Sequence, residues 1–382
     1  MNRICGIFAA VLILLGTAPF KIQSVSAEQP QVSARAAVLI SADTGEIVWA
    51  HDPEKKLPMA STTKIMTALL CIESGGLDEQ FVVDSQAIKV EGSSMGLREG
   101  DIVTKYALCC GMLLPSGNDA ANAAAVRIAG SIDKFAELMN DRARKMGLSK
   151  TFFVTPSGLE GEGHGSSAYD MAILAREALR NDIFRDICSK SSIKLEFGDP
   201  PYPRWLKNTN KLLGMYEGTY GVKTGFTDEA GRCLVSACER DGRSLICVTL
   251  NDRNDWNDHM TLYDLGFSSV KTVSPELPEV LDIPLAGGEK DSIPSVPSET
   301  KCQITSLADK DEFMIETVSS PFVYAPVKKG EQTGSLRVSF RGRAVCEIPL
   351  IAAEDAEIVR KAPEKKRSLS DKFLSVLRRI IP

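Results

Sequence analysis

The sequence lacks several features that would assign it to a familiar class at once. It has three histidines in 382 residues, and neither they nor the cysteines follow a spacing typical of a metal site. It has no excess of basic residues, because the formal net charge is −5, so we expect no nucleic-acid partner. It has no internal repeat and no low-complexity tract. What remains, 43% hydrophobic and 25% charged residues, is typical of a globular protein long enough for two domains.

The N-terminal segment predicts a secretory signal peptide over residues 1–27. Arg3 supplies a positive charge, and an apolar run of nine residues follows at 7–15, too short to span a bilayer. Small residues at 25–27 provide a cleavage site. The alternative interpretation is a buried N-terminal helix. Cleavage would leave nine cysteines, an odd number, and we expect buried free thiols in preference to a disulfide framework.

The C-terminal tail predicts an amphipathic membrane anchor over residues 364–382. Between residues 361 and 382 there are seven Lys or Arg residues and two acidic ones. Apolar side chains recur at the spacing of one helical face, at Leu369, Phe373, Val376, Leu377 and Ile380. A cationic helix of this kind would lie in the surface of an anionic membrane without crossing it. The alternative is a helix packed on the protein's own domain.

The first part of the remaining chain mixes helical and strand patterns. A β-hairpin is expected at 36–50, and strands at 219–226, 232–238 and 244–250, the last two joined by a turn at Asp241-Gly242. Helices are expected between them, at 61–72, 105–114, 119–129, 134–146 and 167–181. This order predicts an α+β fold in which helices cover an antiparallel sheet, over residues 34–267.

The second part has lost the helical pattern. Strands are expected at 313–318, 336–340 and 344–348, and Pro349 should end the last of them. Residues 273–300, rich in Pro, Ser and Glu, are interpreted as a connector or an irregular edge. A small β-rich domain is therefore predicted over residues 273–355.

Candidate chemistry begins with a serine three residues before a lysine. Ser61 and Lys64 would lie on one face of a helix, where the lysine can take the serine proton if its pKa is lowered by burial or positive charge. This spacing occurs five times, so it needs independent support. Ser61 opens the helical pattern, and a helix start presents free N–H groups to a developing oxyanion.

Two other motifs occur once each and support this choice. Ser116-Gly117-Asn118 falls in a break between two predicted helices, and Lys223-Thr224-Gly225 ends a predicted strand. Lys223 and Thr224 would form one wall of a cleft, and Gly225 would let a substrate backbone approach closely. The order SxxK, SxN, KTG is the one found in class A β-lactamases and penicillin-binding proteins.

With these motifs, the chain resembles the serine-type D-Ala-D-Ala carboxypeptidases, the low-molecular-mass penicillin-binding proteins. The likeness extends to residues 93–97, 116–121, 139–140, 156–159, 208–210 and 221–227, and it is weakest over 270–355. It implies a β-lactamase/transpeptidase-like fold. It also implies a peptidoglycan stem peptide ending in D-Ala-D-Ala as substrate, β-lactams as inhibitors, and no cofactor or metal.

The resemblance further implies a role for each motif residue. Ser61 would attack the penultimate D-Ala carbonyl and form an acyl-enzyme, Lys64 would accept its proton, and Ser116, helped by Lys223, would relay a proton to the leaving D-Ala. Substrate would be bound by Asn118 at its amide and by Lys223 and Thr224 at its carboxylate. The oxyanion hole would be the backbone N–H groups of Ser61 and Phe226, beside Gly225.

Three alternatives remain open at this point. A DD-endopeptidase would use the same motifs. A class A β-lactamase would need a glutamate that holds a deacylating water, and no convincing loop for it is found. A non-catalytic peptidoglycan-binding scaffold would not need the intact motifs. No histidine is required, and we expect His164 to be a solvated loop residue.

Overall fold

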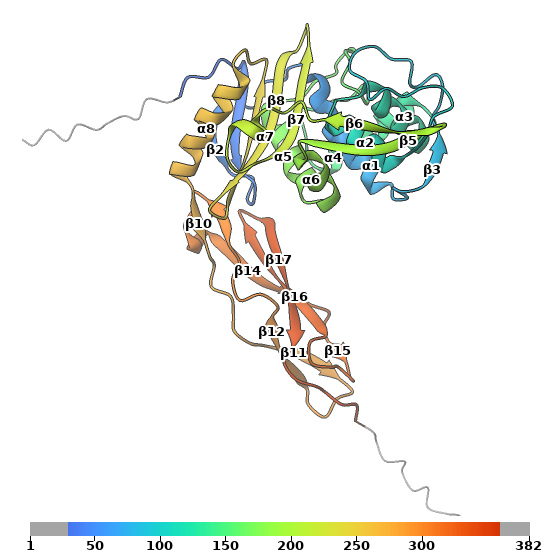
Figure 1. Cartoon of the computed structure of the whole chain (residues 1–382). Helices are drawn as coiled ribbons and strands as arrows, with labels where there is room; N and C mark the ends of the chain where they lie inside the picture. The colour runs from blue at the N-terminus through green and yellow to red at the C-terminus, as the bar shows by residue number, and fades with distance from the viewer. Residues whose placement is uncertain (1–29, 360–382) are drawn as a thin grey trace, which may run out of the picture. The chain divides into compact units, whose positions relative to one another are not determined.

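A five-stranded antiparallel sheet lies at the centre of the first domain in the computed structural model, which describes residues 30–359 (Figure 1). Its strand order is β2 (Ile47–His51), β1 (Ala36–Ser41), β9 (Arg243–Leu250), β8 (Gly231–Arg240) and β7 (Thr219–Thr227). The first hairpin thus pairs with the last strands of the sheet, β1 with β9. The predicted α+β fold is confirmed, and so are the hairpin and these three strands.

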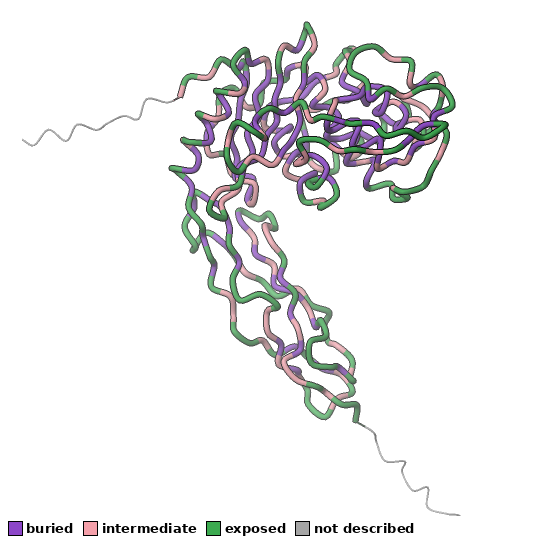
Figure 2. The backbone as a smooth tube through the Cα atoms, in the orientation of Figure 1, coloured by how far each residue is buried: buried purple, intermediate pink, exposed green. Residues whose placement is uncertain are grey.

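Both faces of this sheet are covered, which explains the unbroken apolar run in β1. Ala36, Val38 and Ile40 belong to a large core cluster shared with the helices of one layer. Ala37 and Leu39 point to the opposite face, into a smaller cluster with α8 (Asp255–Ser269). Figure 2 shows buried backbone concentrated in the interior of this domain, and β1 is buried at every residue. The alternation follows from the two-residue period of a strand.

The helical layer confirms four of the expected helices almost to the residue. They are α2 (Lys105–Leu113), α3 (Asn118–Ala129), α4 (Ile132–Lys145) and α5 (Ala168–Leu179). Side-chain oxygens of Thr104, Ser131 and Ser167 cap the starts of α2, α4 and α5. The fifth expected helix is α1 (Lys64–Glu73), which begins one turn later than expected. A short ladder, β3 (Gln80–Val82) with β4 (Ile102–Thr104), flanks this layer.

Several elements were missed by the sequence reasoning. They are α6 (Asp182–Ser189), α7 (Leu212–Met215), α8, and the hairpin of β5 (Ser192–Gly198) with β6 (Pro201–Lys207). Two prolines in β6 masked its strand pattern. The first turn of α8 is rich in Asp and Asn, which are typical of loops, yet Asp255 and Asp258 are buried.

The β-rich domain is a six-stranded sheet with its own core cluster. Its order is β14 (Phe313–Val318), β16 (Gln332–Phe340), β17 (Arg343–Ala352), β12 (Ser292–Pro297), β11 (Leu281–Ala286) and β15 (Val323–Tyr324). A separate two-stranded ladder joins β10 (Lys271–Val273) to β13 (Ile304–Ser306). The strands expected at 313–318, 336–340 and 344–348 are therefore confirmed.

Two expectations in this domain were wrong. Residues 273–300 are not merely a connector, because β11 and β12 belong to the sheet, with Ile283, Leu285 and Ile293 in its core. Pro349 does not end β17, which continues to Ala352. The Pro349 carbonyl accepts a hydrogen bond from Ser298, just past the end of β12. Its ring nitrogen points to that same side, so the ladder with β16 loses no donor there.

The predicted signal peptide and membrane anchor lie outside the described residues. Within residues 30–359, no helix is both long enough and apolar enough to cross a membrane.

Candidate active site

Ser61 lies on a single 3₁₀ turn, η1 (Ala60–Thr63), that immediately precedes α1. Ala60 adopts a left-handed conformation with φ of 47°. The Thr62 hydroxyl donates to the Met59 carbonyl at 2.6 Å, and the Thr63 hydroxyl donates to the Ala60 carbonyl at 2.8 Å. The chain therefore holds Ser61 on a tight, internally bonded turn, which corrects the expectation that Ser61 itself opens an α-helix.

Lys64 begins α1 and is fully buried. Its ammonium nitrogen lies 2.8 Å from the Ser61 hydroxyl, 2.7 Å from the Asn118 side-chain oxygen and 2.6 Å from the Ser157 carbonyl. Burial lowers the pKa of Lys64 well below its usual value, and the positive charge of Lys223 lowers it further, whereas Asp119 opposes both. A neutral amine at this distance from Ser61 is able to accept the hydroxyl proton.

The loop before α3 carries Ser116 and Asn118 to the same place. Ser116 lines the cleft beside Ser61 and adopts a left-handed conformation with φ of 68°. Asn118 is buried, and its amide nitrogen donates to the Glu91 carbonyl at 2.7 Å. Asn118 thus links Lys64 to the loop at residue 91, and it retains one amide hydrogen for another acceptor.

Asp119 organises the segment that follows Glu91. Its carboxylate accepts from the Ser94 hydroxyl at 2.5 Å and from the backbone N–H groups of Met95, Gly96 and Leu97 at 2.9 to 3.1 Å. Bonds of this kind to a carboxylate are strong and directional. They fix the loop that places Ser93 at the edge of the cleft.

Strand β7 forms the wall opposite Ser116 and carries the third motif. A Cβ atom on Gly225 would lie 3.1 Å from the backbone nitrogens of Ser61 and Thr62. Glycine is needed here because the strand lies close to the turn that carries Ser61. The sequence had suggested a different reason, the close approach of a substrate backbone. The Thr224 hydroxyl is hydrogen-bonded to that of Thr209 at 2.7 Å.

Lys223 is buried behind this wall, and its ammonium donates to the Thr224 carbonyl at 2.7 Å. Burial lowers the pKa of Lys223 to about 7. Phe226, the next residue after Gly225, is 63% exposed at the mouth of the cleft. The structure therefore brings together the three motifs, and Ser61, Ser116, Thr224, Gly225 and Phe226 all line one cleft of about 340 Å³.

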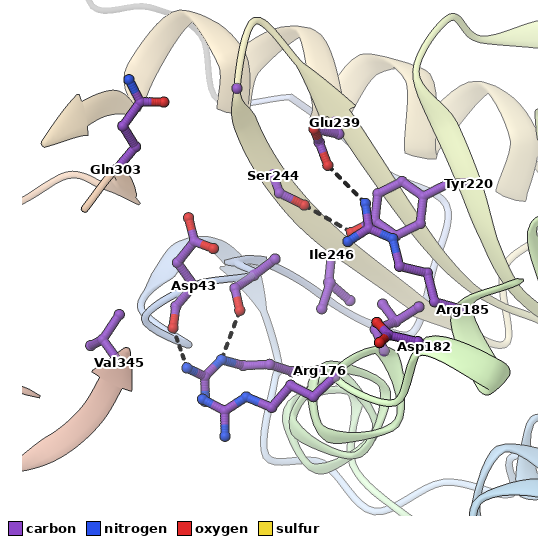
Figure 3. A pocket seen from close by; sticks show the side chains of 14 residues that line it. Asp43, Arg176, Asp182, Arg185, Tyr220, Glu239, Ser244, Ile246, Gln303 and Val345 are labelled. Carbon is purple, nitrogen blue, oxygen red and sulfur yellow. Dashed lines mark hydrogen bonds and ion pairs between the residues drawn. The ribbon is translucent and has the colours of Figure 1, made fainter. Parts of the chain in front are cut away.

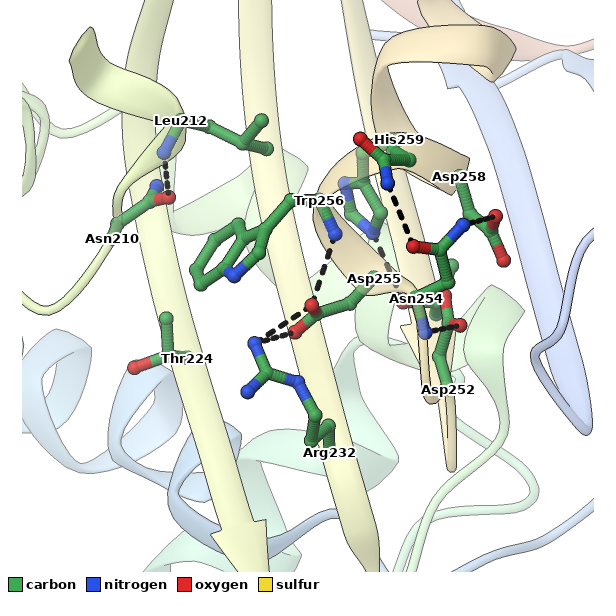
Figure 4. A network of polar contacts seen from close by, with 12 residues as sticks. Asn210, Leu212, Thr224, Arg232, Asp252, Asn254, Asp255, Trp256, Asp258 and His259 are labelled. Atoms are coloured by element: carbon green, nitrogen blue, oxygen red, sulfur yellow. Dashed lines mark hydrogen bonds and ion pairs between the residues drawn. The ribbon is translucent and has the colours of Figure 1, made fainter. Parts of the chain in front are cut away.

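The sequence reasoning missed Arg232, which lines the same cleft with Asp255 and Trp256. The Arg232 guanidinium donates to both Asp255 oxygens, at 2.7 and 2.9 Å, and lies 5.4 Å from the Trp256 ring (Figure 4). Its side chain is 42% exposed, so it keeps donors free for a ligand. Arg232 reaches the cleft because β8 pairs with β7, which places it opposite Phe226.

His164 is not the solvated loop residue that was expected. Its Nε2 lies 2.9 Å from the Thr63 hydroxyl, and its Nδ1 accepts from the Val154 backbone N–H at 2.9 Å. Burial lowers the pKa of His164 to about 4, helped by the charge of Lys56. The ring is therefore neutral, with its proton on Nε2, and it ties the loop at residues 154–165 to the turn that holds Ser61.

Within the part of the chain that the structure describes, no group of three or more His, Cys, Asp or Glu side chains is placed to hold a metal ion.

Comparison with known proteins gives this arrangement a family. A family model described as D-alanyl-D-alanine carboxypeptidase, peptidase family S11, matches residues 23–254. The chain belongs to this family. The D-alanyl-D-alanine carboxypeptidase DacF of Bacillus subtilis is 32% identical over 350 residues, which cover 88% of this chain and 90% of that protein. The resemblance inferred from the motifs is confirmed.

Two further relatives cover most of both domains. The D-alanyl-D-alanine carboxypeptidase DacC of Escherichia coli is 31% identical over 376 residues, with 91% of this chain and 90% of that protein covered. The crystal structure of penicillin-binding protein 5 from Haemophilus influenzae matches with a TM-score of 0.62 and 26% identity, over 86% of this chain and 99% of that one. As an S11 family member, the protein is a serine peptidase with a penicillin-binding-protein fold.

A second cavity in this S11 peptidase lies at another part of the sheet (Figure 3). Two of its arginines already have protein partners: Arg185 is paired with Glu239 at 2.9 Å, and the Arg176 guanidinium donates to the Ala42 and Asp43 carbonyls. Ser244 there is bonded to Tyr220 at 2.8 Å, with no lysine beside it. Among the described residues, the serine of this cavity thus lacks the lysine partner that Ser61 has in the cleft.

Proposed function

We propose that this protein is a serine D-Ala-D-Ala carboxypeptidase that removes the terminal D-Ala from peptidoglycan pentapeptide stems and acts in cell-wall biogenesis. The supporting observation is the buried Lys64 amine, 2.8 Å from the Ser61 hydroxyl. The lowered pKa of Lys64 favours the neutral amine, the form that can accept a proton. The same site would bind β-lactams, which resemble the D-Ala-D-Ala end.

Acylation begins when Lys64 takes the Ser61 proton and Ser61 Oγ attacks the carbonyl carbon of the penultimate D-Ala. The negative charge on the carbonyl oxygen is stabilised by the backbone N–H groups of Ser61 and Phe226. Support for this geometry comes from Gly225, which lets β7 lie against the Ser61 turn.

Collapse of the tetrahedral intermediate breaks the peptide bond and releases D-Ala. The leaving nitrogen needs a proton, and Ser116, which lines the cleft beside Ser61, delivers it with the help of Lys223. Ser116 regains a proton from Lys64, which returns to the neutral amine. Water then attacks the acyl-enzyme, Lys64 accepts a proton from the water and returns it to Ser61 Oγ, and the shortened stem is released.

Substrate binding uses the opposite wall and the mouth of the cleft. Asn118 binds the backbone amide of the stem through its remaining amide hydrogen. Lys223 and Thr224 attract the terminal carboxylate, and Arg232 adds a partly exposed guanidinium on the same side. A cationic wall is expected where an anionic chain end must be recognised.

The test of this function combines two assays of the full mature chain. Wild-type protein should be labelled by a fluorescent penicillin and should release D-Ala from a pentapeptide, and Ser61→Ala should do neither. Ser93→Ala is the matched control, because Ser93 lines the same cleft outside the motifs, and it should retain both activities. Equal labelling of wild type and Ser61→Ala would refute the catalytic assignment.

The same preparation separates the alternatives. Rapid turnover of penicillin would identify a β-lactamase, whereas a long-lived acyl-enzyme identifies a carboxypeptidase. Release of monomers from a cross-linked stem dimer, without D-Ala release, would identify a DD-endopeptidase. Binding of peptidoglycan without labelling would identify a scaffold.

For the whole chain we propose export by a signal peptide at residues 1–27, a catalytic domain at 34–267, a β-rich domain at 273–355 and an amphipathic anchor at 364–382. Support comes from the sequence of the two ends. The anchor would hold the enzyme peripherally on the outer face of the cytoplasmic membrane. Truncation after Ala362 should abolish co-sedimentation with vesicles of anionic phospholipid while D-Ala release persists, and continued sedimentation would exclude the anchor.

A further inference from the structure

Cys302 and Cys346 form a sulfur pair in the β-rich domain that no step of the reaction uses. Their Sγ atoms lie 2.8 Å apart, which is closer than the van der Waals contact distance of two unbonded sulfur atoms. Only a small movement would bring the two sulfurs to the length of a disulfide bond. Cys346 lies on β17, where it pairs with Val338 of β16. Cys302 lies two residues before β13. The fold therefore already brings the two sulfurs together.

Solvent accessibility distinguishes this pair from the cysteines of the catalytic domain. Cys346 is half-buried, whereas Cys71, Cys109 and Cys110 are completely buried in the core between α1, α2 and their neighbours. Cys71 and Cys109 are also neighbours, yet no reagent of ordinary size reaches them in the folded protein. Reactive cysteines are those that are partly exposed and able to form a thiolate.

We propose that Cys302 and Cys346 form a disulfide once the chain has reached the oxidising side of the membrane. The oxidant is a disulfide compound, either a thiol–disulfide oxidoreductase or a small-molecule disulfide such as oxidised glutathione. This inference depends on the proposed export and is independent of the peptidase chemistry at Ser61.

The disulfide forms by two successive thiol–disulfide exchange steps. The thiolate of Cys346 attacks one sulfur of the oxidant and forms a mixed disulfide, while the other sulfur leaves as a thiolate. Cys302 then loses its proton to solvent and attacks Cys346 Sγ, which releases the second oxidant sulfur. The protein loses two electrons and two protons, and the oxidant's disulfide is reduced to two thiols.

The local hydrogen bond favours this order of attack. The hydrogen bond between the two sulfurs lowers the pKa of Cys346, whereas the same bond and burial raise the pKa of Cys302. The more accessible sulfur is thus also the one that ionises first.

The disulfide would lie beside the contacts between the two domains. The Thr305 carbonyl accepts from the Ser41 hydroxyl at 2.6 Å, its N–H donates to Asp43 at 2.7 Å, and its hydroxyl accepts from the Ser244 N–H at 2.9 Å. A bond at Cys302 joins this segment covalently to β17 in the main sheet of the β-rich domain. It also closes a loop from residue 302 to residue 346, which reduces the freedom of the unfolded chain.

Mass spectrometry of the wild-type chain tests the bond directly. The protein is secreted from its host or refolded in a glutathione redox buffer, its free thiols are blocked with N-ethylmaleimide in denaturant, and it is digested without reductant. The expected product is a peptide pair joined through Cys302 and Cys346, with two fewer blocked thiols than in a reduced sample. N-ethylmaleimide on both of these cysteines in the unreduced sample would overturn the proposal.

Thermal unfolding supplies a second readout that does not rely on recovering that peptide. Reductant should lower the unfolding midpoint of the wild type by about 10 °C and should leave that of C302S/C346S nearly unchanged. The double variant should still be labelled by penicillin, because neither cysteine lies in the cleft. An equal effect of reductant on both proteins would show that another cysteine pair is responsible.

Discussion

The groups behind Ser61 are largely buried and hydrogen-bonded to other parts of the site, whereas the residues at the mouth of the cleft are partly exposed. We call Thr63, Lys64, Asn118 and His164 the back wall, and Thr224, Phe226, Arg232 and Trp256 the mouth. Every back-wall residue makes a hydrogen bond of 2.9 Å or less to another part of the site. At the mouth, Phe226 is 63% exposed and the Arg232 side chain 42%.

This difference separates two tasks of one enzyme. The back wall sets the protonation state of Lys64 and the position of Ser61, so changes there should act on kcat and on the rate of acylation. The mouth meets the substrate's charged end, so changes there should act on KM. The following substitutions test that division, in order of decreasing expected effect.

Lys64→Arg should have the largest effect, a loss of about 10³-fold in the rate of acylation by penicillin. Arginine keeps the positive charge but does not give up its proton near neutral pH, so it removes the base alone. Stopped-flow labelling with a fluorescent penicillin measures the rate. Lys211→Arg, an exposed lysine at the same cleft, is the control and should react normally. A near-normal rate in Lys64→Arg would assign the base to another group.

His164→Leu should lower kcat for D-Ala release by about 10-fold with little change in KM, because it removes the bonds to Thr63 and Val154. His164→Gln retains a donor near the Nε2 position and should recover part of the loss. His51→Leu, at an exposed histidine, is the matched control. A rise in KM with unchanged kcat would place His164 on the substrate side of the division.

Arg232→Gln should raise KM about 10-fold for a substrate with a free C-terminal carboxylate, with kcat nearly unchanged. A substrate amidated at its C-terminus should bind wild type and variant almost equally, because it lacks the charge that Arg232 meets. The amidated substrate therefore distinguishes carboxylate recognition from general damage to the cleft. A loss in kcat alone would contradict the role assigned to the mouth.

The smallest effect concerns stability against pH. The pKa of His164 is about 4 in the folded protein and near 6.5 when unfolded. Between these values the unfolded chain binds more protons, so this residue's contribution to folding falls as pH falls from about 6.5 to 4 and stays low below that. The stability of wild type relative to His164→Gln should decline by roughly 3 kcal/mol across this interval. Urea unfolding at pH 7 and pH 4.5 measures it, and a pH-independent difference would refute the neutral ring.

The motif residues could be predicted from the sequence because their chemistry requires particular side chains at fixed spacing. The α+β fold could be predicted because both β1 and the amphipathic helices show their periods plainly. Other parts depend on tertiary contacts that leave no local pattern. Arg232 becomes recognisable only when β8 pairs with β7, and His164 only when its loop folds back onto Thr63. In β12, prolines and serines obscured a strand that its sheet neighbours stabilise.

Two residues beside the reacting atoms, Ala60 and Ser116, hold left-handed backbone conformations that favour glycine. Each such residue costs on the order of 1 kcal/mol. Laboratory selection for thermal stability alone should therefore enrich substitutions at these positions. The gain in stability should be accompanied by slower turnover. These positions are thus among those where the enzyme could most easily gain stability. They are also among those where natural selection for activity should most strongly oppose the change.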